Sequence, residues 1–203
     1  MIVVVDYNAG NLRSIQKALQ LYSNSVVVSD KPEDILSADK IVLPGVGNFG
    51  KAMEHISEKK GDLSIGEAIL ESINKVPFLG ICLGMQLLME SSEECPNCLG
   101  FGVFEGNVIK FRNVEKIPHM GWNSVNLVKD MPLFEGIKNN EYFYFVHSYY
   151  VNPKNLDEVV GGTSDYGTTF PCILNKDDIY ATQFHPEKSG KIGLKVIKNF
   201  IEL

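Results

Sequence analysis

Short apolar runs alternate with amphipathic stretches along the first 90 residues of the chain. The continuous apolar runs are typical of buried strands, and we expect such strands at 2–7, 26–28, 40–43 and 76–81. Apolar positions at helical spacing predict helices between them, at 12–22, 32–36, 53–56, 65–73 and 84–90. Strands that alternate with helices indicate a mostly parallel, open central sheet that is flanked by helices.

The pattern changes after residue 95, where the apolar runs become shorter and richer in aromatic and β-branched side chains. Such runs are typical of hairpins that are partly antiparallel. We expect strands at 102–104, 108–111, 124–128, 142–151, 172–174 and 179–184. A helix with one apolar face is predicted at 191–202. The chain, 1–203, is therefore expected to form a single α/β domain with antiparallel hairpins in its C-terminal half.

Composition and charge exclude several classes of protein. The chain has 203 residues and a mass of 22.6 kDa, which suits one domain. Its net charge is −6 and its basic residues are scattered, which argues against nucleic-acid binding. The apolar runs fall short of the ~18 residues of a membrane span. Because the stretch from Met1 to Asp6 lacks the pattern of a signal peptide, we expect a cytoplasmic protein.

The four cysteines lie at positions 82, 95, 98 and 172. In a chain of this length they do not indicate a disulfide scaffold. Cys95 and Cys98 have the spacing of a metal-binding pair, but a structural zinc needs four ligands and no second pair follows. We therefore expect a loop with incidental thiols at this point, and neither a metal nor a cofactor.

Cys82 is the candidate nucleophile. It lies between Gly80 and Gly84, where a predicted strand meets a predicted helix, and this is the cysteine form of a nucleophile elbow. The start of a helix favours thiolate over thiol, and the backbone amide of Leu83 would face the oxyanion of an acyl transfer. The alternative is a buried structural cysteine, since free cysteines are among the most buried residues.

A thiol nucleophile needs a base, and the chain offers four histidines. His55 falls on a predicted surface helix, while His119 and His147 fit backbone-bonded or packed positions. His185 differs, because it ends an apolar strand and is followed two residues later by Glu187, which can bond its second ring nitrogen. Cys82, His185 and Glu187 therefore form a complete set of nucleophile, base and orienting acid.

A glycine-rich turn, Pro44-Gly45-Val46-Gly47, follows a predicted strand at the same end of the sheet as Cys82. Parallel sheets bind ligands at the carboxyl ends of their strands, yet this turn has neither of the common phosphate-binding patterns. The turn is better explained as the source of a backbone amide that points at an oxyanion. We expect this amide to be flipped into place when substrate binds, because the flanking glycines permit a peptide flip.

Two motifs, Gly-Ile-Cys-Leu-Gly-Met-Gln at 80–86 and Gln-Phe-His-Pro-Glu-Lys at 183–188, resemble those of the class I glutamine amidotransferases of the triad type. Further motifs at 6–14, 44–53, 118–123 and 144–149 are similar to the glutaminase subunits of imidazole glycerol phosphate synthase. This resemblance implies glutamine hydrolysis, with the ammonia passed to a (β/α)₈ cyclase subunit that forms imidazole glycerol phosphate in histidine biosynthesis.

The resemblance also implies roles for individual residues. Cys82 would attack the glutamine amide, His185 would protonate the departing ammonia, and Glu187 would orient the histidine. Three further sets are an oxyanion site of Val46 or Gly47 with Leu83, a substrate site of Gln86, Glu94, Ser148 and Tyr149, and a partner interface of Asn8, Asn11, Trp122 and Lys188. His119 and His147 are motif residues without an assigned chemical step.

Three other functions are compatible with parts of this pattern. A paralogous glutaminase could supply ammonia for the amidination of a surface-glycan sugar, and the sequence alone does not separate it from the first hypothesis. The glutaminase of pyridoxal phosphate synthase is disfavoured by the motifs at 6–14 and 118–123. A catalytically silent regulatory subunit is disfavoured by the intact triad.

Overall fold

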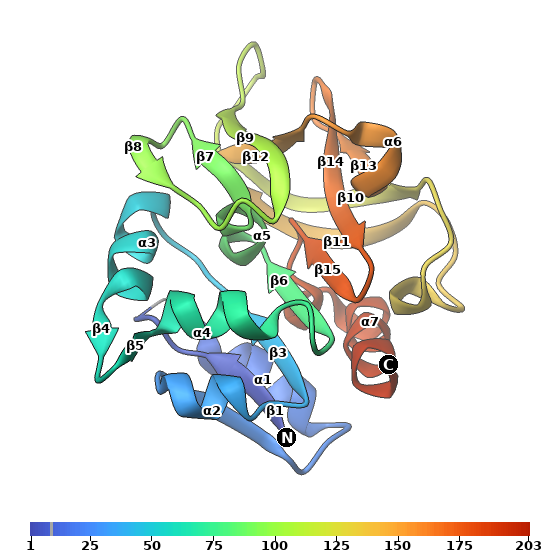
Figure 1. Ribbon diagram of the computed structural model, residues 1–203. Helices are drawn as coiled ribbons and strands as arrows, with labels where there is room; N and C mark the ends of the chain where they lie inside the picture. The colour runs from blue at the N-terminus through green and yellow to red at the C-terminus, as the bar shows by residue number, and fades with distance from the viewer. Residues whose placement is uncertain (9) are drawn as a thin grey trace.

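A nine-stranded mixed sheet runs through the computed structural model, which describes residues 1–8 and 10–203 (Figure 1). One half of the sheet is parallel and contains, in spatial order, β2 (Val26–Ser29), β1 (Ile2–Val5), β3 (Lys40–Leu43), β6 (Phe78–Ile81) and β15 (Ile179–Thr182). The other half is antiparallel and continues with β14 (Thr169–Lys176), β13 (Val160–Asp165), β10 (His119–Leu127) and β11 (Glu141–His147).

Helices cover both faces of the parallel half (Figure 1). One face carries α1 (Leu12–Gln20) and α7 (Gly190–Glu202), and the other carries α2 (Pro32–Leu36), α3 (Phe49–Ser57), α4 (Ile65–Ser72) and α5 (Leu83–Leu87). In β1, Val3 and Val5 belong to one core and Ile2 and Val4 to the other. Since successive side chains of a strand point to opposite faces, only a continuously apolar strand suits a sheet buried on both sides.

A smaller sheet packs beside the antiparallel half. Its strands, in spatial order, are β12 (Tyr149–Pro153), β9 (Phe104–Lys110), β7 (Met89–Ser92) and β8 (Cys95–Leu99). The remaining elements are the hairpin β4 (Lys59–Lys60) and β5 (Leu63–Ser64), the helix α6 (Leu156–Val159), and the 3₁₀ turns η1 (Pro132–Phe134) and η2 (Pro186–Lys188). This confirms a single α/β domain with a mostly parallel N-terminal half and antiparallel strands in the C-terminal half.

The two strands predicted at 102–104 and 108–111 are one strand, β9, which pairs with β12 and β7 from distant parts of the chain. Two other predicted elements are also wrong in their extent. The helix predicted at 84–90 ends at Leu87, because Met89 begins β7 and pairs with Phe104 of β9. The strand predicted at 142–151 is two strands that belong to different sheets, with Ser148 between them. In both places the pairing partner comes from a distant part of the chain, so the local pattern does not reveal it.

The loop predicted at Cys95 and Cys98 is also wrong. These residues lie in β8, which pairs with β7, and their side chains form a disulfide. The sequence pattern missed β13 as well, because two glycines interrupt its apolar run. None of the helices in the described ranges combines the length and the hydropathy that a membrane crossing requires.

Candidate active site

Cys82 occupies a sharp turn between β6 and α5, as the elbow pattern predicts. Its backbone has φ 53° and ψ −104°, a conformation that a side chain other than glycine rarely adopts and that often marks a functional position. The turn requires the two flanking glycines. A Cβ atom at Gly84 would lie 1.8 Å from the carbonyl oxygen of Leu43, and one at Gly80 would lie 3.1 Å from the backbone of Gly84.

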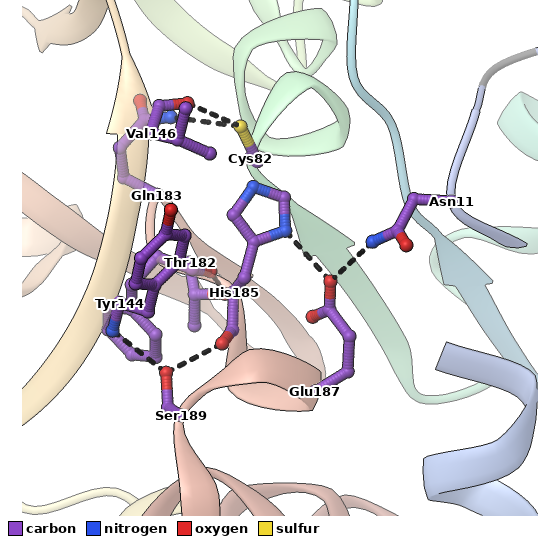
Figure 2. Close-up of polar contacts among 10 residues, drawn as sticks. Asn11, Cys82, Tyr144, Val146, Thr182, Gln183, His185, Glu187 and Ser189 are labelled. Atoms are coloured by element: carbon purple, nitrogen blue, oxygen red, sulfur yellow. Dashed lines mark hydrogen bonds and ion pairs between the residues drawn. The ribbon is translucent and has the colours of Figure 1, made fainter. Parts of the chain in front are cut away.

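His185 reaches Cys82 because their strands are neighbours. β15 pairs in parallel with β6, and Thr182 lies opposite Ile81. The residues that follow these two strands therefore lie at the same edge of the sheet. Nδ1 of His185 donates to Oε1 of Glu187 at 2.8 Å, and both side chains are only 2% exposed. Figure 2 shows the other ring nitrogen turned toward the sulfur. The structure thus brings the three predicted triad residues together.

The charges of the site keep His185 protonated. Burial alone lowers the pKa of this imidazole, but the Cys82 thiolate and the Glu187 carboxylate outweigh burial and raise the pKa to about 10. In the described ranges, Nε2 of His185 makes no hydrogen bond of normal geometry. It is therefore available to exchange a proton with a substrate held above the sulfur.

Asn11 is a second hydrogen-bond donor to Glu187, although the sequence predicted Asn11 as an interface residue. Nδ2 of Asn11 donates to Oε1 of Glu187 at 3.0 Å, from the start of α1 (Figure 2). The two residues are 176 positions apart, so no local signal could have indicated this contact. Asn11 thus helps to fix the acid of the triad, in addition to its predicted place at an interface.

A cavity of about 270 Å³ opens above Cys82. It is lined by Val46, Gly47, Cys82, Leu83, Gln86, Glu94, Pro118, Val146, His147, Ser148 and Tyr149. These include every residue of the predicted oxyanion and substrate sets. A larger hollow of about 460 Å³ beside η1 has neither a thiol nor a histidine among its described lining residues, so the smaller cavity is the candidate substrate site.

The polar side chains of the cavity are fixed by hydrogen bonds. Nε2 of Gln86 donates to the carbonyl of Tyr149 at 3.0 Å and to Oε1 of Gln183 at 3.1 Å. Gln86 is 6% exposed, so its side chain is buried although it lies on a helix. Oε2 of Glu94 accepts from the backbone N–H of Phe49 at 2.7 Å. Both side chains therefore present their remaining oxygen atoms from fixed positions.

The predicted oxyanion donor is already engaged. The N–H of Leu83 donates to the carbonyl of Gly45 at 3.3 Å. In a trans peptide the N–H points opposite to the C=O, so the N–H of Val46 points away from Leu83. The buried Tyr7 hydroxyl stabilises the 44–47 turn, because it donates to the carbonyl of Pro44 at 2.7 Å. Tyr7 was not identified from the sequence.

His119 and His147 form a buried pair that sequence reasoning left without a role. They lie directly opposite each other on β10 and β11, with His119 Nδ1 2.9 Å from His147 Nε2. Nδ1 of His147 donates to the carbonyl of Tyr149 at 2.8 Å, so its Nε2 must accept the proton of His119. Burial lowers the pKa of His119 to about 4 and that of His147 to about 3. This neutral pair therefore fixes a carbonyl of the cavity wall.

Three of the four predicted interface residues are exposed, and Asn11 is half-buried. Asn8 and Lys188 are exposed, and Trp122 of β10 is 56% exposed. Met120 and Tyr142 extend the apolar surface on the same pair of strands, at 60% and 59% exposure. Within residues 1–8 and 10–203, no group of three or more His, Cys, Asp or Glu side chains is arranged to hold a metal ion.

Fold and site together have the arrangement of an α/β enzyme with a cysteine, a histidine and a carboxylate at one sheet edge. Residues 3–203 match the family described as glutamine amidotransferase class-I. The chain is 68% identical over 203 residues to imidazole glycerol phosphate synthase subunit HisH 1 of Methanococcus maripaludis, with 100% of both chains covered. It is 60% identical over 204 residues to the HisH subunit of Methanocaldococcus jannaschii, also with 100% of both covered.

Solved structures share this fold. A crystal structure of a glutamine amidotransferase superposes with a TM-score of 0.76 at 17% identity, and the match covers 100% of this chain and 98% of that one. The chain therefore belongs to the class-I glutamine amidotransferases, in the group of the HisH subunits of imidazole glycerol phosphate synthase.

Proposed function

We propose that residues 1–203 form one glutaminase domain that hydrolyses the side-chain amide of glutamine at Cys82, with His185 and Glu187 as its partners. The observation that carries this proposal is the geometry at the sheet edge. A strained cysteine lines the cavity, and a buried imidazole bonded to a buried carboxylate lies beside it at the same sheet edge. Each element of a thiol-dependent amide hydrolysis is therefore within reach of a bound substrate.

In the first half of the reaction, the Cys82 thiolate uses an electron pair to form a C–S bond to the amide carbon, and the carbonyl electrons move onto oxygen. Nε2 of His185 gives its proton to the nitrogen, the C–N bond breaks, and ammonia leaves. The product is a thioester on Cys82. The raised pKa of His185 supports this step, because the imidazolium is populated at neutral pH.

In the second half, water replaces ammonia at the same position. The now neutral His185 takes a proton from water, the resulting hydroxide adds to the thioester carbon, and the C–S bond breaks. Glutamate leaves, and the thiolate and imidazolium are restored. Glu187 stabilises the charged imidazolium in both halves through its 2.8 Å contact with Nδ1.

We assign the amino-acid end of glutamine to Gln86 and Glu94, with the backbone of Ser148 and Tyr149. Both protons of the Gln86 amide group are donated to the protein, so its oxygen is the atom left for an ammonium or N–H group of the substrate. Glu94 supplies a carboxylate for the substrate's ammonium group. The His119 and His147 pair supports this wall by holding the Tyr149 carbonyl.

The ammonia that the chain releases is used in histidine biosynthesis. The chain supplies ammonia to the cyclase subunit of imidazole glycerol phosphate synthase, as its full-length identity of 68% and 60% to HisH subunits indicates. These relatives do not favour the amidination of a surface-glycan sugar. We assign the cyclase interface to the surface formed by Asn8, Asn11, Trp122 and Lys188. We place the complex in the cytoplasm.

The contact between the Gly45 carbonyl and the Leu83 N–H supports a switch at this turn. The Gly45 carbonyl occupies the Leu83 N–H at 3.3 Å, so a substrate oxygen must displace it before that donor can act. A flip of the peptide between Gly45 and Val46 would remove the carbonyl and turn the Val46 N–H toward the oxyanion, beside Gly47. We assign this flip to the loading of the cyclase partner, since coupling requires that the partner favours one of the two states.

The test is glutamate release from glutamine by the purified chain, alone and with the cyclase subunit and its nucleotide ligand. We expect strong stimulation by the loaded partner and no release by the Cys82→Ala variant under either condition. Release that ignores this partner would refute the assigned acceptor while leaving the triad intact. Release by Cys82→Ala would refute the triad itself.

A further inference from the structure

Gln183 is a buried polar residue that is not part of the triad. It follows β15 and precedes Phe184 and His185, and it is 0% exposed. Its backbone N–H donates to the carbonyl of Cys172 at 2.9 Å. Its side-chain Nε2 lies 3.6 Å from Sγ of Cys82, within hydrogen-bond distance for sulfur (Figure 2). A buried amide beside the nucleophile therefore needs a chemical explanation.

The orientation of the Gln183 amide follows from its neighbours. The carbonyl of Tyr149 only accepts hydrogen bonds, so the end of Gln86 that contacts it must be the NH₂ group. The same NH₂ group lies 3.1 Å from Gln183, which must present its oxygen there. The NH₂ group of Gln183 is left to face the sulfur. The donor next to Cys82 is thus fixed by a chain of contacts that begins at a backbone carbonyl.

We propose that Gln183 is a further catalytic residue of the amide hydrolysis, because its Nε2–H donates a hydrogen bond to the thiolate of Cys82. This inference rests on the proposed function. Gln86 holds the donor in place from the substrate cavity. Gln183 therefore touches the reacting atom without being among the residues that line the substrate cavity.

The surroundings of the sulfur explain why a donor is needed. The carbonyl oxygen of Val146 lies 3.9 Å from Sγ, and a thiolate has no hydrogen to offer it. His185 alone could return its proton to the sulfur and leave a neutral pair. The Gln183 donor favours the thiolate and imidazolium pair, because hydrogen bonds to an ionised acceptor are stronger than those to a neutral one.

The same contact acts at two points of the reaction without any proton transfer from Gln183. When the C–S bond forms, the sulfur loses its charge and the hydrogen bond weakens. When the C–S bond of the thioester breaks, the electron pair returns to sulfur and the hydrogen bond strengthens. Gln183 thus stabilises the thiolate as nucleophile and as leaving group, and its own N–H bonds stay intact.

The experiment measures the rate of Cys82 alkylation by iodoacetamide as a function of pH, with the modified residue located by peptide mass. Gln183→Met removes the donor and keeps the volume. Gln183→Glu keeps an oxygen toward Gln86 and places a carboxyl group next to the sulfur. Gln20→Met at the exposed end of α1 is the matched control. Glutamate release with the loaded partner is measured for each protein.

For Gln183→Met we expect the alkylation inflection to rise by about one pH unit, as the loss of one hydrogen bond to a charged group produces. For Gln183→Glu we expect a larger rise, because its carboxylate also repels the thiolate. We expect kcat to fall about tenfold, while KM of Gln183→Glu changes less than kcat. Gln20→Met should match the wild type. If Gln183→Met does not fold, Gln183→Leu decides the question, because it also removes the donor and adds no charge beside the sulfur.

An unchanged inflection in a folded Gln183 variant would overturn the proposal and leave Gln183 a packing residue. The alkylation profile needs no turnover, so it reports on Gln183 independently of the reaction. Absence of glutamate release by the wild type with its loaded partner would instead be a failure of the proposed function.

Discussion

Glu187→Gln is the perturbation that isolates the charge of the triad acid. Oε1 of Glu187 accepts from His185 at 2.8 Å and from Asn11 at 3.0 Å, and an amide oxygen of the same shape can accept both bonds. The substitution therefore keeps the geometry and removes the negative charge. Because both side chains are 2% exposed, solvent screens little of this charge.

The size of the effect follows from the contact that changes. A hydrogen bond to a charged group contributes about 1.5–3 kcal/mol, and about 1.4 kcal/mol of barrier corresponds to a tenfold change in rate. We expect kcat to fall about 10- to 100-fold. The pKa of His185, about 10 in the wild type, should fall, because burial acts to lower it and only the Cys82 thiolate would still oppose burial.

The assay is glutamate release with the loaded cyclase partner, from about pH 6 to about pH 10. The wild type should retain its activity through the alkaline range, whereas Glu187→Gln should lose activity at lower pH as its imidazolium deprotonates. Glu33→Gln, at an exposed position of α2, is the matched control. A variant with kcat close to the wild type and an unmoved alkaline limb would refute the role of the carboxylate.

Three further substitutions probe the support of the site. Tyr7→Phe leaves the Pro44 carbonyl buried without its donor, so the free energy of unfolding in urea should fall by about 1–3 kcal/mol, and an unchanged value would contradict this. Burial holds the pKa of His119 near 4 and that of His147 near 3, so the unfolded chain binds more protons below about pH 6.5 and stability is lost as pH falls. His119→Phe should therefore weaken the dependence of the urea midpoint on pH between about pH 7 and pH 5, whereas equal dependence would argue against this histidine. Gly84→Ala places a Cβ atom 1.8 Å from a backbone oxygen of β3, so little soluble protein is expected, and a folded, active variant would contradict the geometry of the turn.

The triad could be predicted because its signals are local. Cys82 lies in a glycine-flanked turn, and His185 lies two residues from its acid. The parallel pairing of β6 with β15 then brings these two short motifs together. The alternation of apolar strands with helices was equally informative, since buried parallel strands have a continuous apolar pattern.

The contacts that support the triad could not be predicted, because they join distant parts of the chain. Gln183 and Cys82 are 101 positions apart, and Asn11 and Glu187 are 176 apart. β7 was missed for a related reason. Met89 continues an apolar helical pattern, and only its pairing with Phe104 shows that it belongs to a strand. Tertiary contacts thus override local preference at both places.

The most direct test of the central claim is covalent labelling of the nucleophile. A glutamine analogue with a diazoketone in place of the side-chain amide reacts with a thiolate held above the substrate site. We expect one label per chain, located on Cys82 by peptide mass, with labelling suppressed by glutamine and absent from Cys82→Ala. A label on another residue, with Cys82 unmodified and glutamate release lost, would contradict the assignment of Cys82 as the nucleophile.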